Sequence, residues 1–113
     1  MRRGEVWLIN LDPTVGSEIK KTRPAVIVND DAIGILPLRV IVPITAWQDR
    51  NAVAPWMVRL EPETTNGLDK PSAADAFQVR SVSHVRFVRQ LGTVSAQALQ
   101  DITRALATVL AIS

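Results

Sequence analysis

Short apolar runs separated by polar turns dominate the first two thirds of the chain. Branched and aromatic residues are concentrated in the ranges 5–11 and 23–28, and each run ends at a turn signal rich in Asp, Asn or Pro. Runs of this length and composition are typical of β-strands. By the same criteria, further elements are predicted over the ranges 38–45, 56–60, 72–79 and 86–91, with a turn at 65–67.

The last segment of the chain has a different period. Leu99, Ile102, Leu106 and Val109 recur at helical spacing, and polar residues occupy the opposite face. This pattern predicts an amphipathic helix, for which Ser95 is the expected N-cap. Several short strands followed by one helix predict a mainly β domain with a C-terminal helix. The expected form is a small antiparallel barrel, or half-barrel, with loops gathered at its ends.

The composition is that of one compact domain. The 113 residues are 47% hydrophobic and contain no low-complexity linker, so we expect a single domain with one core. No apolar run reaches the roughly 20 residues of a membrane span, and the start of the chain does not resemble a signal peptide. We therefore expect a cytoplasmic protein that has no contact with a membrane.

Cysteine is absent and histidine occurs once, which excludes several kinds of metal site and catalytic nucleophile. Without cysteine the chain has no disulfide, no thiolate metal site and no cysteine nucleophile. The acidic residues are scattered, which argues against a two-metal nuclease centre. We expect neither a metal nor any other cofactor.

Arginine supplies ten of the thirteen basic residues, although the net charge is only +2. Arg23 follows the polar loop 14–22 and opens an apolar strand, and Thr45 ends another strand. A guanidinium and a hydroxyl at strand ends suit phosphate binding and stabilisation of the charge that develops on it. The alternatives are a solvated arginine and an ordinary strand threonine.

Other polar residues are candidates for substrate binding. Lys20 and Lys21 form either a solvated face or a loop that closes over a polyanion. Glu18 is either their ion-pair partner or a general base. Gln78 and Arg80 lie on one side of the predicted strand, where such a pair can read base edges or clamp phosphate. The alternative is that Gln78 is a hydrogen-bonded residue of the barrel and Arg80 a surface arginine.

Two tryptophans bracket the second long loop, at positions 47 and 56. An exposed indole at this place stacks well on an unpaired base. Tryptophans beside strands also serve as core residues, so both interpretations stay open.

Several motifs follow one another along the chain in a characteristic order. They are Arg3-Gly4-Glu5-Val6-Trp7-Leu8, then Leu11-Asp12-Pro13-Thr14-Val15-Gly16-Ser17-Glu18, then Thr22-Arg23-Pro24-Ala25-Val26-Ile27-Val28, and finally Val42-Pro43-Ile44-Thr45. Together they resemble the MazF/PemK family of toxin endoribonucleases nearly from end to end. The segment Gln78-Val79-Arg80-Ser81-Val82 supports the same resemblance.

The resemblance implies a homodimer of SH3-like barrels that cleaves single-stranded RNA without a metal ion. It also implies a MazE-like antitoxin whose acidic tail occupies the RNA groove. By position, Arg23 matches the catalytic arginine of the family, Thr45 its catalytic threonine or serine, and Glu18 an acid important in some members. The chain departs from the family pattern at Phe77, where members often carry an acid.

The implied reaction fits these residues, because the 2'-hydroxyl of RNA is a nucleophile already placed beside the phosphorus. The expected products are a 2',3'-cyclic phosphate and a 5'-hydroxyl. Two other functions remain open from sequence: a non-enzymatic barrel toxin that inhibits a protein such as DNA gyrase, and a barrel that binds single-stranded RNA without cutting it.

Overall fold

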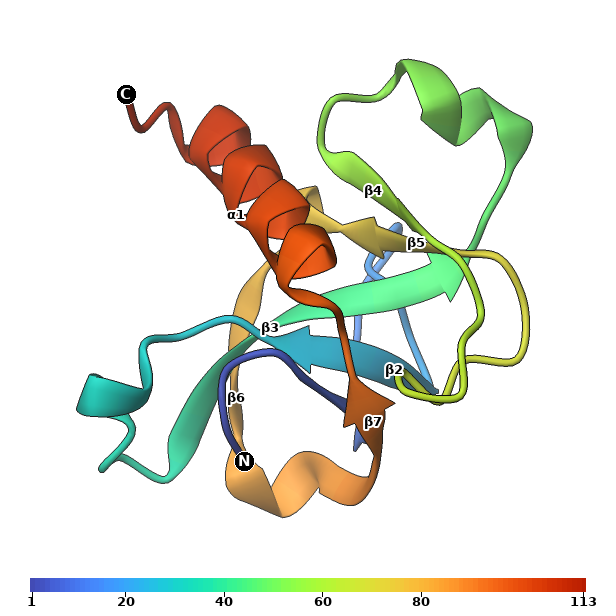
Figure 1. Cartoon of the computed structure of the whole chain (residues 1–113). Coiled ribbons are helices and arrows are strands. Elements are labelled where there is room, and N and C mark those ends of the chain that lie inside the picture. Colours follow the sequence, from blue (N-terminus) through green and yellow to red (C-terminus); the bar gives the residue numbers. More distant parts are fainter.

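The computed structural model describes residues 1–113 and consists of seven strands, four short 3-10 turns and one C-terminal helix (Figure 1). The strands are β1 (Glu5–Asn10), β2 (Thr22–Ile27), β3 (Leu38–Ala46), β4 (Met57–Leu60), β5 (Ser72–Asp75), β6 (Arg80–Ser83) and β7 (Phe87–Thr93). The helix is α1 (Ala96–Leu110), and the 3-10 turns are η1 (Asp31–Ile33), η2 (Asp49–Val53), η3 (Ala76–Gln78) and η4 (His84–Arg86).

All strand pairs are antiparallel and form one curved sheet in the order β4-β5-β3-β2-β1-β7, with β6 paired to β3. The long strand β3 pairs with β2 and β6 along its first part and with β5 at its end. The end strands β4 and β7 are not paired with each other, so the sheet stays open. The predicted fold class, mainly β with a C-terminal helix, is confirmed, and the barrel is a half-barrel.

The strand predicted over 72–79 is wrong in one respect. β5 ends at Asp75, the chain makes the 3-10 turn η3, and a separate strand β6 begins at Arg80. Asp75 accepts a hydrogen bond from Phe77 N at 3.1 Å and so caps this turn. An aspartate side chain that bonds the backbone two residues ahead favours a turn over a continuous strand.

Side chains on the two faces of the sheet build two hydrophobic clusters. One face carries Val6, Val26 and Val42, which lie in register on three neighbouring strands and pack with Ile102 of α1. Figure 1 shows α1 lying across this side of the sheet. The other face carries Ile9, Ile27 and Ile41 and is partly covered by Ile19 from the loop 14–22.

The C-terminal helix forms as its sequence predicts. The Ser95 hydroxyl accepts a hydrogen bond from Ala98 N at 3.1 Å, which satisfies one of the free amides of the first turn. Ile102 and Ala105 are buried on the face that meets the sheet. At fifteen residues, α1 is too short and too polar to cross a membrane.

The predicted turn at 65–67 is also present, and Gly67 is required in it. Its φ is +70°, and a Cβ atom there would lie 2.1 Å from the carbonyl oxygen of Leu91. The turn therefore packs directly against β7, which only glycine permits.

Candidate active site

Arg23 and Thr45 come together at one end of the β2/β3 pair. The register aligns Ala25 with Pro43, and continuing it by two residues brings Arg23 opposite Thr45. Because side chains alternate along a strand, these two lie on the face away from α1. Both line a cavity of about 220 Å³, which we call the strand-end cavity.

The Arg23 guanidinium is oriented by the backbone of the loop before it. Its Nε donates to the carbonyl oxygen of Lys20 at 3.2 Å. The three ion pairs of the chain lie elsewhere, so no carboxylate neutralises Arg23. A half-buried guanidinium held through Nε keeps its Nη donors for a ligand in the cavity.

The strand-end cavity contains two charged residues that the sequence interpretation did not single out. Asp69 and Lys70, from the loop between β4 and β5, line it together with Arg23 and Thr45. They stand in the run Gly67-Leu68-Asp69-Lys70-Pro71, where an adjacent acid and base follow a turn. That pair is a weak signal, because charged pairs in loops are usually solvated.

A second cavity, of about 510 Å³, is lined by Glu18, Gln78 and Arg80, and we call it the loop cavity. Three of the residues predicted to bind substrate therefore lie together, but none of them lines the strand-end cavity. Pro43 of β3 lines the loop cavity, and Ile44 and Thr45 line the other. The two cavities are thus neighbours along β3.

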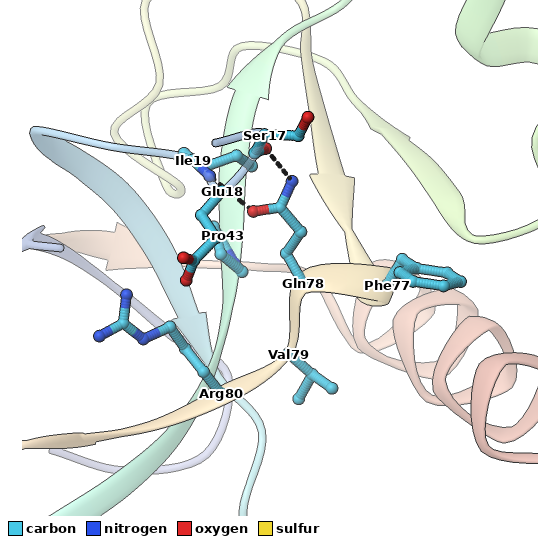
Figure 2. A pocket seen from close by; sticks show the side chains of 8 residues that line it. All are labelled: Ser17, Glu18, Ile19, Pro43, Phe77, Gln78, Val79 and Arg80. Carbon is cyan, nitrogen blue, oxygen red and sulfur yellow. Dashed lines mark hydrogen bonds between the residues drawn. The ribbon is translucent and has the colours of Figure 1, made fainter. Parts of the chain in front are cut away.

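Gln78 does not share a strand face with Arg80, contrary to the prediction, because it ends the turn η3. Its Oε1 accepts from Ile19 N at 2.6 Å, and its Nε2 donates to Ser17 O at 3.2 Å. Figure 2 shows the amide facing these two backbone atoms. The side chain thus ties the loop 14–22 to η3, instead of pointing freely into a groove.

The basic loop is held at one further point, and the segment just before it is held by Arg80. Arg80 Nη1 donates to Leu11 O at 3.1 Å, and Lys21 N donates to Asp12 Oδ1 at 3.1 Å. The side chains of Lys20 and Lys21 are exposed and line neither cavity. Closure of these two lysines over a polyanion therefore stays a prediction.

Glu18 makes a local hydrogen bond instead of the expected ion pair. Its Oε1 accepts from Val15 N at 2.8 Å, and no lysine lies within ion-pair distance. The carboxylate stabilises the turn at the start of the loop. In Figure 2 it lies on the same side of the loop cavity as the Arg80 guanidinium.

The two tryptophans are half-buried, and each has a stacking partner. Arg59 lies over the ring of Trp47, with its Cζ 4.9 Å from the ring centroid. Trp56 packs edge-on against Phe77, with ring centroids 5.7 Å apart. Phe77, at the position where the chain departs from the family pattern, is 65% exposed.

Asp75 is buried at the start of η3. Burial raises the pKa of its carboxyl, and hydrogen bonds from Phe77 and Gln78 partly oppose this effect by lowering it. No group of three or more His, Asp or Glu side chains is close enough together to hold a metal ion.

Comparison with known proteins gives the family. Residues 2–110 match the model of the PemK-like, MazF-like toxins of type II toxin–antitoxin systems. The chain belongs to this family. It is 39% identical over 112 residues to a Mycobacterium tuberculosis protein named endoribonuclease MazF9, covering 94% of this chain and 92% of that protein.

Solved structures of MazF proteins share the fold. The crystal structure of MazF from Deinococcus radiodurans has a TM-score of 0.82 at 24% identity and covers 99% of this chain and 97% of that one. A mycobacterial endoribonuclease solved with its cognate antitoxin has a TM-score of 0.79 at 21% identity, with coverages of 100% and 97%. These structures show that the chain has the fold of the MazF proteins, and the family match over residues 2–110 confirms the resemblance drawn from its motifs.

Proposed function

We propose that the chain is a sequence-specific, metal-independent endoribonuclease that cleaves single-stranded RNA, chiefly mRNA in the cytoplasm. The observation that supports this most is the cavity shared by Arg23 and Thr45. A guanidinium fork and a hydroxyl on one side of a small cavity match the needs of a phosphoryl group that gains charge during reaction.

In the proposed reaction the 2'-oxygen forms a bond to phosphorus and the bond from phosphorus to the 5'-oxygen breaks. The products are a 2',3'-cyclic phosphate and a 5'-hydroxyl, whose oxygen takes up a proton from solvent as it leaves. Arg23 stabilises the charge of the pentavalent intermediate, and Thr45 donates a hydrogen bond to a non-bridging oxygen. The substrate supplies the nucleophile, so the protein contributes geometry and charge, and no metal-activated water is needed.

A proton must leave the 2'-hydroxyl, and arginine is a poor acceptor because it is always protonated. Glu18 lines the loop cavity, whereas Asp69 lines the same cavity as Arg23 and Thr45. We assign Asp69 as the acceptor and Lys70 as a second phosphate contact. Glu18, Gln78 and Arg80 are assigned to substrate binding at the loop cavity, and the exposed side chains of Lys20 and Lys21 are assigned to further phosphate contacts.

The proposal includes two protein partners. We expect the chain to form a homodimer and to be inhibited by a MazE-like antitoxin with an acidic tail. The cavities carry the cations Arg23, Lys70 and Arg80, which suit such a tail. One of the structural neighbours, a mycobacterial endoribonuclease, was solved with its cognate antitoxin.

The direct test is to incubate the purified protein with a long RNA in EDTA, map the cut ends and identify the terminal phosphate. Arg23→Ala should lower kcat by about 100-fold or more, the scale of one charge-stabilising donor. Thr45→Val, which removes only the hydroxyl, should lower kcat in the same direction. Arg89→Ala, an exposed arginine of β7, is the matched control.

Two results would contradict the mechanism. One is cleavage of an RNA whose 2'-hydroxyl at the cut site is replaced by hydrogen. The other is an Arg23→Ala protein that cuts at the wild-type rate. A barrel that binds RNA without cutting would show no product at all, and a gyrase inhibitor would show neither product nor RNA binding.

A further inference from the structure

We propose that Arg59, backed by Trp47, forms a base-stacking subsite next to the strand-end cavity, and this inference rests on the proposed endoribonuclease function. It concerns four side chains that cross the sheet in one line. The register pairs Thr45 with Ala73 and Ala73 with Arg59. Continued at β2, it adds Arg23 beyond Thr45.

Paired residues of neighbouring strands point to the same face, so Arg23, Thr45, Ala73 and Arg59 form one row along one face of the sheet. Thr45 and Arg59 are two strands apart, which is about 10 Å at the usual strand spacing. Ala73 between them has a short side chain and no exposed surface. The row therefore runs from the two proposed catalytic residues, on β2 and β3, across β5 to a second arginine on β4.

Trp47 continues β3 on this same face, two residues beyond Thr45. Its backbone N donates to Pro71 O at 3.0 Å, which extends the β3/β5 pairing past the end of β3. The indole lies diagonally across from Arg59, and the guanidinium stacks over it, with Cζ 4.9 Å from the ring centroid. The indole thus restricts the position of the guanidinium.

Glu61 holds the same guanidinium from its edge. Arg59 Nε donates to Glu61 Oε1 at 2.5 Å, and 47% of the Arg59 side chain remains exposed. With Cζ over the indole and Nε bonded to the carboxylate, nearly half of the Arg59 side chain is still accessible to a ligand. A pair that served only to cover the indole would not need this edge contact.

An arginine plane held in this way is a surface on which unpaired RNA bases stack. A nucleotide beside the scissile phosphate would continue the stack of indole and guanidinium, along the row that begins at Arg23. Arg59 is the residue that contacts the base, and Trp47 and Glu61 position it. The subsite should accept any base, because stacking needs only a flat ring.

The test uses short RNA oligonucleotides in which one base at a time around the cut site is removed. At one position near the cut, removal should lower the wild-type kcat/KM by roughly 5- to 150-fold, the scale of one base stacked on a side chain. Arg59→Lys keeps the charge but loses the flat fork, so it should show a comparable loss with the intact oligonucleotide. In that variant, removing the same base should cost little more.

Binding is measured separately with oligonucleotides that carry a 2'-deoxyribose at the cut site, by fluorescence anisotropy. Trp47→Phe, which keeps an aromatic ring, should retain most of the base dependence, whereas Arg59→Ala should lose it. Arg89→Lys, on β7 at the opposite end of the strand order, should behave as wild type.

The results separate this proposal from the one on which it rests. Equal losses from base removal in wild type and Arg59→Lys, in both assays, would overturn the subsite and leave the nuclease intact. Base-dependent binding at Arg59 with no cleavage in EDTA would keep the subsite and overturn the proposed reaction. Absence of binding to any of the oligonucleotides would overturn both.

Discussion

Asp75 is the one buried ionisable side chain of the molecule, with 5% of its surface exposed. It accepts hydrogen bonds that cap η3, but no cation faces it within ion-pair distance. A carboxylate in such a place loses more solvation than its hydrogen bonds return, which is why its pKa is raised. The hydrogen bonds of this cap therefore stabilise the fold, whereas the buried negative charge of the Asp75 carboxylate destabilises it.

Because the buried charge is destabilising, the stability of the protein is predicted to depend on pH. Since the folded pKa of Asp75 lies above its ordinary value of 3.8, the folded state binds the proton more tightly than the unfolded state. Its contribution to the unfolding free energy rises as the pH falls through the folded pKa, and levels off below the unfolded value. Asp75→Asn removes this dependence while keeping the oxygen that caps the turn.

At pH 7 the Asn variant should therefore be at least as stable as wild type in urea unfolding, and the difference should shrink toward pH 4. Asp75→Ala, which loses the cap, should be less stable by about 1 kcal/mol or more. A difference between Asn variant and wild type that stays constant over this range would show that the buried charge carries no such cost.

At the scale of elements, the loop 14–22 is more ordered than its sequence indicates. It has neither a helical nor a strand period, yet the side chains of Gln78 and Asp12 hold its backbone through three hydrogen bonds. Gln78 lies up to 61 residues away from its partners in the chain. Local sequence carries no signal for contacts of that separation, so these bonds could not be predicted from the loop residues.

Gln78 should therefore control both the order of the loop and the orientation of Arg23. Gln78→Ala removes the acceptor of the Ile19 amide, and hydrogen exchange at that amide should accelerate by roughly 5- to 100-fold, as expected for one lost buried hydrogen bond. RNA cleavage should slow as well, because the carbonyl of Lys20 that holds Arg23 Nε belongs to this loop.

Gln100→Ala is the matched control, since this exposed glutamine lies on α1. Unchanged exchange at Ile19 in Gln78→Ala would mean that the amide is protected by something other than this hydrogen bond. Slower cleavage with normal exchange would instead assign Gln78 to direct contact with RNA.

For the whole molecule, the larger hydrophobic cluster and the two proposed catalytic residues lie on opposite faces of the sheet. The face under α1 holds the larger cluster, and the other holds Arg23 and Thr45 beside a smaller one. Changes in the α1 face should alter stability while leaving the chemistry of the folded protein unchanged.

Ile102→Ala tests this separation. Ile102 is fully buried in the cluster between α1 and the sheet, so the substitution should lower the unfolding free energy by about 2–5 kcal/mol. Below the unfolding transition, kcat for RNA should stay near that of wild type. Ile112→Ala, at a position 63% exposed, should change neither quantity. A large fall in kcat of folded Ile102→Ala would show that the two faces are coupled.

The sequence by itself determined the elements with local signals. Runs of β-branched residues marked the strands, helical spacing marked α1, and Ser95 and Gly67 marked a cap and a turn. It also determined the family, because its motifs are read directly from residue order. These features depend on interactions within a few residues, which the order of side chains already specifies.

The tertiary structure decided which side chains meet. Only the register of β2, β3, β5 and β4 aligns Arg23, Thr45 and Arg59 in one row, and only the loop after β4 adds Asp69 to the cavity. It also showed that the Gln78 amide hydrogen-bonds the backbone of the loop 14–22, whereas the sequence predicted that it faces a groove. The reason is physical: strand pairing and loop packing bring together residues far apart in the chain, and their partners are chosen by the whole fold.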